Sequence, residues 1–134
     1  MRKLLLIISI LLSFNVVSAQ QQKDTLSYSS LSKEQRLKWS DLEDKWTLDY
    51  FNNFLQKNKL KTSCARCNSI IFEALFIVIE NGGVKVELIS NKVCGKNFTK
   101  KQEAELKQLL QKIIFPAEFY NGNYLFKMGR TLKC

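Results

Sequence analysis

The chain has 134 residues and a formal net charge of +9, with 46% hydrophobic and 25% charged residues, which predicts one folded domain attracted to acidic partners or anionic surfaces. It contains no histidine, which excludes Ser-His-Asp catalysis, Cys-His catalysis and any histidine-ligated metal site. No other nucleophile and base stand in a recognisable pattern, so we expect no enzyme, no metal and no cofactor.

The first segment has the order of a secretory signal peptide. Arg2 and Lys3 precede an apolar run at residues 4–12, and Val17-Ser18-Ala19 is a small-residue cleavage signature. An uncleaved anchor is the alternative, but a membrane span needs about 20 apolar residues and Asn15 interrupts this run. We therefore expect a signal peptide at residues 1–19, cleaved near Ala19-Gln20. The product is then periplasmic or extracellular, with no stable membrane insertion.

Residues 20–30 are polar and rich in Ser and Gln, which predicts a flexible leader before a single α+β domain at residues 31–134. From Ser32 the pattern becomes helical, because Ser32 and Gln35 fit a capping box. Apolar residues then recur at steps of three and four along one face: Trp39, Leu42, Trp46, Tyr50 and Phe54. Two tryptophans on such a face serve either a ligand platform or the core, and we favour the core.

Two strands and a second helix follow. Residues 69–80 are apolar at both odd and even positions, which indicates a central strand covered on both faces. Asn81-Gly82-Gly83 is typical of a hairpin turn, after which residues 84–88 alternate as a strand with one exposed face. Thr99 and Gln102 open a helix that ends before Pro116, and residues 124–132 alternate as a last strand.

The element order helix-strand-strand-helix-strand restricts the sheet. The second and third strands run parallel and are joined by a helix, so the first strand fits between them as in a split βαβ unit. We therefore expect an α+β fold with two main helices and a three-stranded antiparallel sheet of order 2-1-3, tied by disulfides.

The four cysteines fall at one pole of this expected sheet: Cys64, Cys67, Cys94 and Cys134. An even number in an exported domain predicts disulfides, with three possible connectivities. The hairpin register places Cys94 opposite residues 69–70, which favours the pair Cys67–Cys94 and then Cys64–Cys134.

Two other interpretations of the cysteines stay open. Cys64-Ala65-Arg66-Cys67 has the spacing of a thiol-disulfide redox pair, although a strand rather than a helix follows it. The same spacing is half of a four-thiolate zinc site, but Cys94 and Cys134 form no matching second half.

Cations gather at the same pole and form a candidate basic patch: Arg66, Lys92, Lys96, Lys100, Lys101 and Lys133. Lys100 and Lys101 stand in the first turn of a helix, where the dipole disfavours cations, and such a violation sometimes marks a binding surface. A solvated lysine-rich end is the simpler interpretation. Few aromatic residues interleave with these cations, so we expect no nucleic-acid partner.

Residues 70–132 resemble the C-terminal domain of the TonB energy-transducer family. The similarity lies in the hairpin FIVIENGGVKVELI, the helix KKQEAELKQLLQKI, Phe115-Pro116-Ala117 and a last strand introduced by a glycine turn. The resemblance implies the same element order and a last strand whose edge receives a peptide from an outer-membrane receptor by strand addition. Carried onto this chain, the candidate binding edge contains Tyr124, Phe126, Met128 and Arg130.

The sequence thus predicts an exported, non-enzymatic module that binds a protein or peptide in the envelope or outside the cell, and it leaves the oligomeric state open. The alternatives are a thiol-disulfide redox protein that uses Cys64 and Cys67, and a secreted inhibitor or effector.

Overall fold

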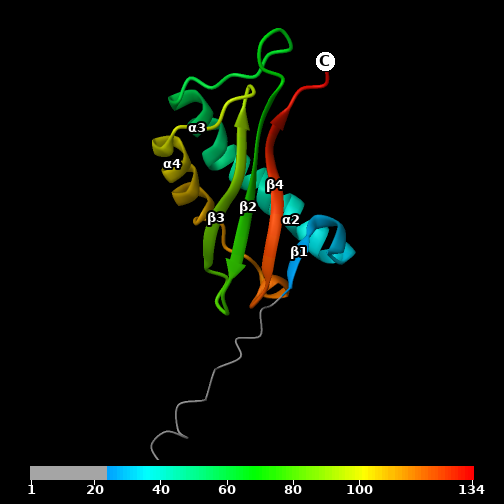
Figure 1. Cartoon of the computed structure of the whole chain (residues 1–134). Coiled ribbons are helices and arrows are strands. Elements are labelled where there is room, and N and C mark those ends of the chain that lie inside the picture. Colours follow the sequence, from blue (N-terminus) through cyan, green and yellow to red (C-terminus); the bar gives the residue numbers. More distant parts are fainter. Residues whose placement is uncertain (1–23) are drawn as a thin grey trace, which may run out of the picture.

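The computed structural model describes residues 24–134, in which helices pack on one face of a mixed four-stranded sheet (Figure 1). The strands are β1 (Thr25–Ser27), β2 (Ser69–Val78), β3 (Val84–Val93) and β4 (Asn123–Thr131). The helices are α2 (Lys33–Trp46), α3 (Asn52–Lys57) and α4 (Lys100–Leu110), with a π-helical turn, η2 (Thr47–Phe51), joining α2 to α3. Short 3-10 turns, η1 (Tyr28–Ser30) and η3 (Ala117–Phe119), precede α2 and β4. The expected signal peptide at residues 1–19 lies outside the described residues.

The sheet has the strand order β1-β4-β2-β3. β2 pairs antiparallel with both β3 and β4, so the predicted α+β class and the order of the three long strands are confirmed. The predicted limit of three antiparallel strands is wrong, because β1 adds a fourth strand that runs parallel to β4. This strand falls in residues 20–30, where we expected a flexible leader. Only Leu26 of β1 packs against the core. The strand therefore has no alternating apolar pattern by which the sequence could have revealed it.

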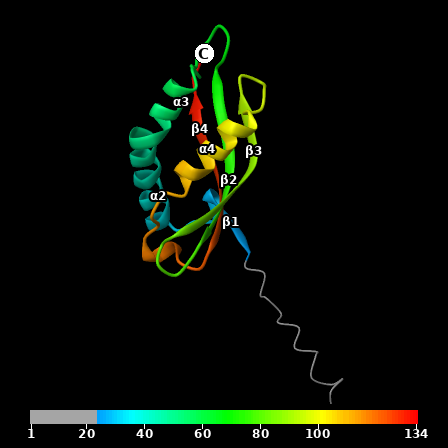
Figure 2. The same ribbon diagram turned by 90° about the vertical axis from the view of Figure 1, so that its left-hand side faces the viewer.

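The helices cover one face of the sheet and leave the other open (Figure 2). β2 accordingly alternates between half-buried and buried residues along its whole length. The expectation that both faces of residues 69–80 are covered is therefore wrong: Ile71, Leu75 and Ile77 are half-exposed on the outer face. Long side chains on the neighbouring strand β3 stand opposite two of these residues, Lys92 beside Ile71 and Lys85 beside Ile77, where their stems can shield apolar surface.

The aromatic face of α2 packs into the core, as predicted. The Trp39 ring stacks on Phe126 with ring centroids 3.9 Å apart and lies 5.8 Å from the Phe115 ring. Trp46 is also buried and donates its indole N–H to the Leu109 carbonyl at 2.8 Å, which ties α2 to α4. Both tryptophans are therefore core residues and not a ligand platform.

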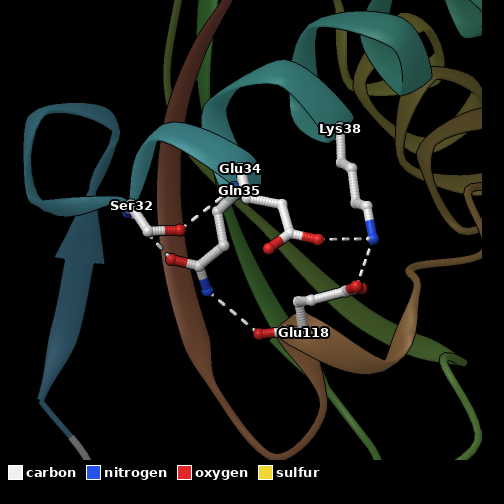
Figure 3. Close-up of polar contacts among 5 residues, drawn as sticks. All are labelled: Ser32, Glu34, Gln35, Lys38 and Glu118. Carbon is white, nitrogen blue, oxygen red and sulfur yellow. Dashed lines mark hydrogen bonds and ion pairs between the residues drawn. The ribbon is translucent and has the colours of Figure 1, made fainter.

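The start of α2 is fastened to the turn that precedes β4 (Figure 3). The Ser32 hydroxyl accepts from the Gln35 backbone N–H, and the Gln35 side chain accepts from the Ser32 N–H, so the predicted capping box forms. The Gln35 amide also donates to the Glu118 carbonyl at 2.9 Å. Lys38 forms ion pairs with Glu34 at 3.2 Å and with Glu118. These contacts fix the position of α2 beside the first half of β4.

Candidate functional site

Two disulfides close one pole of the sheet. Cys64 is bonded to Cys134 and Cys67 to Cys94, with Cα atoms 5.6 and 4.6 Å apart, and these are the pairs that the strand order favoured. Each half of the C-x-x-C motif is thus joined to a distant cysteine and not to the other half. Within residues 24–134 no cysteine is free and no group of three metal-ligating side chains lies together. Two disulfides indicate an oxidising compartment, as expected outside the cytoplasm.

The candidate basic patch surrounds this disulfide pole. Arg66, Lys96 and Lys133 lie in loops, Lys92 near the end of β3, and Lys100 and Lys101 in the first turn of α4, and all six are exposed. That turn is capped by the Thr99 hydroxyl, which accepts from the Gln102 backbone N–H at 3.2 Å. None of the six cations forms an ion pair within the part of the chain that the structure describes. They form a solvated positive surface at this pole. In that same part of the chain, none of the helices has the length and apolar character needed to cross a bilayer.

The residues of the candidate edge divide between core and surface. The side chains of Tyr124, Phe126 and Met128 are buried beneath the helices, and Phe126 is 1% exposed. Arg130 is exposed and donates from Nη2 to Asn52 Oδ1 at 2.5 Å. Three of the four predicted residues therefore do not offer their side chains to a partner.

The hydrogen-bond register shows which backbone groups of β4 face away from β2. The Leu132 N–H donates to the Asn68 carbonyl and the Val78 N–H to the Gly122 carbonyl, and the register between these two bonds is unbroken. Because bonding alternates along an antiparallel pair, the even-numbered residues of β4 bond to β2. The N–H and C=O groups of Lys127, Gly129 and Thr131 therefore point to the opposite edge.

β1 occupies only the first part of that edge. It pairs with Asn123, Tyr124 and Leu125, after which the chain turns away through η1. The expected binding edge at Tyr124–Arg130 therefore begins later than predicted, since Tyr124 already pairs with Leu26 of β1. Among the described residues, no strand pairs with this side of residues 126–131, which we call the open edge.

Two hollows lie at the ends of the open edge, between β4 and the run of α2, η2 and α3. The first, which we call the Glu43 hollow, measures about 350 Å³ and is lined by Tyr28, Trp39, Ser40, Glu43, Phe126 and Lys127. The second, the Arg130 groove, measures about 590 Å³ and is lined by Asn52, Leu55, Lys59, Leu60, Lys61 and Arg130. The helices thus leave space on the inner side of the edge at both ends.

The two hollows differ in charge: one carboxylate, Glu43, and one cation, Lys127, line the first, whereas three cations line the second. Partial burial raises the pKa of the Glu43 carboxyl above its ordinary value, and the neighbouring Asp44 adds a smaller effect in the same direction. No group within residues 24–134 donates a hydrogen bond or forms an ion pair with Glu43. In the Arg130 groove, Lys59, Lys61 and Arg130 likewise have no carboxylate partner among those residues.

Glu43, Lys59 and Asn52 were not among the candidate site residues that the sequence marked. Glu43 lies one residue from the apolar face of α2, and Lys59 follows α3 with a positive φ of 54°. Only the path of the helices behind β4 brings these residues to the open edge. No family model, curated protein or solved structure gives a significant match to this chain.

Proposed function

We propose that this protein is an exported, non-enzymatic binding module that captures an extended segment of another envelope or extracellular protein by adding it as a strand to β4. The observation that carries the proposal is the open edge, with the backbone groups of Lys127, Gly129 and Thr131 facing away from β2. Backbone bonds at such an edge give affinity, and the surroundings of alternate side chains give selectivity.

The other margin of the sheet, β3, is less suited to this role. Its register with β2 shifts between Glu73 and Ala74, and a bulge of this kind twists an edge and interrupts strand addition. The β4 edge keeps a continuous register from Asn123 to Thr131 and has hollows beside it. The resemblance to the TonB C-terminal domain supports the same strand and an envelope partner.

Lys127→Pro tests the proposal, because this substitution removes one outward N–H. Proline is tolerated on an edge strand when its N–H would face solvent, so the variant should fold. Phe126→Pro is the poorer choice, since residue 126 bonds to β2 and its ring stacks on Trp39. Lys127→Thr is the matched control, because it removes the charge and keeps the N–H.

The full exported chain and both variants are used as bait in envelope extracts, after disulfide mapping and thermal melting have shown that all three are folded. We expect a partner to be recovered by the natural chain and by Lys127→Thr, and to be lost with Lys127→Pro. Equal recovery by all three folded proteins contradicts strand addition at this edge.

A further inference from the structure

The geometry of the open edge specifies how far apart the recognised side chains of a partner must be. This step rests on the proposed strand addition. Residues directly opposite one another in a sheet point to the same face, so partner residues opposite Phe126 and Arg130 point toward the helices. These two positions are four residues apart, which is about 13 Å at about 3.3 Å per residue.

The partner residue opposite Phe126 enters the Glu43 hollow. Glu43 is a half-buried carboxylate without a donor partner in residues 24–134, and such a group favours an incoming cation. Tyr28 lines the same hollow and is 48% exposed, so its ring offers surface to the stem of a long side chain. Lys127 also borders the hollow, but it belongs to the outer face of β4, where Glu73 stands opposite it on β2.

The partner residue opposite Arg130 enters the Arg130 groove. Its floor contains Leu55, which is 4% exposed, and Leu60, which is half-buried, and its rim carries the cations Lys59, Lys61 and Arg130. The Asn52 amide oxygen accepts from one Arg130 nitrogen and holds the guanidinium at the groove. A carboxylate on a short apolar stem fits this combination of apolar floor and cationic rim.

We propose that the partner segment carries a lysine or arginine and an aspartate or glutamate four residues apart, with the cation in the Glu43 hollow and the carboxylate in the Arg130 groove. The order of the two charges along the partner then defines its direction. A segment parallel to β4, as β1 is, has the cation first, and an antiparallel segment has the carboxylate first.

Synthetic ten-residue peptides of Thr and Val with a fluorescent label test this proposal by fluorescence polarisation on the full exported chain. One peptide carries Lys at position 3 and Glu at position 7, and a second carries them in the reverse order. The matched controls carry Gln at both positions, or Lys at position 3 and Glu at position 6, which places the charges on opposite faces of a strand.

We expect one of the two four-residue spacings to bind at least about tenfold more tightly than both controls, which corresponds to about 1.4 kcal/mol. Glu43→Gln should remove the advantage of the Lys, and Arg130→Gln should remove most of the advantage of the Glu. Glu43→Lys should reverse the preference at that position from Lys to Glu. Glu87→Gln, on β3 beyond the central strand, is the control that should leave all affinities unchanged.

Equal affinity of the charged and the Gln peptides, with binding still lost in Lys127→Pro, overturns the charge pattern and leaves strand addition standing. Absence of binding by every peptide, together with a Lys127→Pro variant that recovers partners normally, overturns the proposed function itself. A dimer in sedimentation experiments that Lys127→Pro dissociates would identify a second copy of the chain as the occupant and would likewise overturn this proposal.

Discussion

Removal of the Cys64–Cys134 disulfide should cost about 4 kcal/mol of unfolding free energy. The bond joins residues 70 positions apart, for which the chain-entropy relation gives about 4.4 kcal/mol, against about 3.5 kcal/mol for the 27 positions between Cys67 and Cys94. Cys64 and Cys134 are both exposed, so Cys64→Ala with Cys134→Ala removes little packing, and the loop effect is measured almost alone. Since the whole free energy of unfolding of a domain of this size is about 5–15 kcal/mol, this loss is a large part of it.

Urea unfolding followed by the fluorescence of the buried Trp39 and Trp46 measures this loss. The comparison variant is Cys67→Ala with Cys94→Ala. Its loop effect on the unfolding free energy is smaller, but Cys67 is only 6% exposed, so the variant also loses buried contacts. The two double variants should therefore lose similar amounts. A loss below about 1 kcal/mol for Cys64→Ala with Cys134→Ala would refute the reasoning, because it would mean that the bond does not restrict the unfolded chain.

Two further predictions concern β4 and the Glu43 hollow. Gly129→Ala should lower the unfolding free energy by about 1–3 kcal/mol, because φ is +125° and the added Cβ would lie 2.9 Å from the Ile71 Cα. Gly95→Ala also has a positive φ but meets no atom within 4 Å, so its loss in the same urea assay should be smaller, and an equal loss would contradict the close approach at Gly129. Glu43→Gln should be more stable than the natural chain at pH 7, because burial raises the pKa of Glu43 in the folded state and penalises its charge there. This advantage should shrink as the pH falls through the raised folded-state pKa and vanish below the ordinary value of 4.5, and a difference that stays constant in melts from pH 7 to pH 3 would contradict it.

Features that depend on a few neighbouring residues could be predicted from the sequence. The capping boxes at Ser32 and Thr99 each need only four successive residues, and both form as expected. The order of the long strands followed from their sequence order and from the helix that connects two of them. Once that order was set, the hairpin register also brought Cys94 near Cys67.

Features that depend on distant segments could not be predicted in this way. β1 has three residues and no apolar period, and its partner is the last strand of the chain. Apolar residues at odd and even positions of β2 indicated that both faces of the strand are covered. The pattern does not say whether helices of the same chain cover both faces. Glu43 and Arg130 line hollows beside the same strand only because the helix run passes behind β4, and no local motif encodes that path.

An unpaired strand edge is a hazard for aggregation, and proteins usually cover, bend or charge such edges. β1 lies on the correct side of β4 to cover the edge, yet the chain leaves it after Ser27 through η1, and Leu31 then enters the core with 4% exposure. This turn uncovers the backbone of Lys127 and, through Tyr28, forms one wall of the Glu43 hollow. The same turn therefore creates the free backbone and the charged hollow beside it. A protein that only had to avoid aggregation would keep the free backbone groups of β4 covered. Recognition of an extended charged segment instead requires that the free backbone and the charged hollow are both exposed.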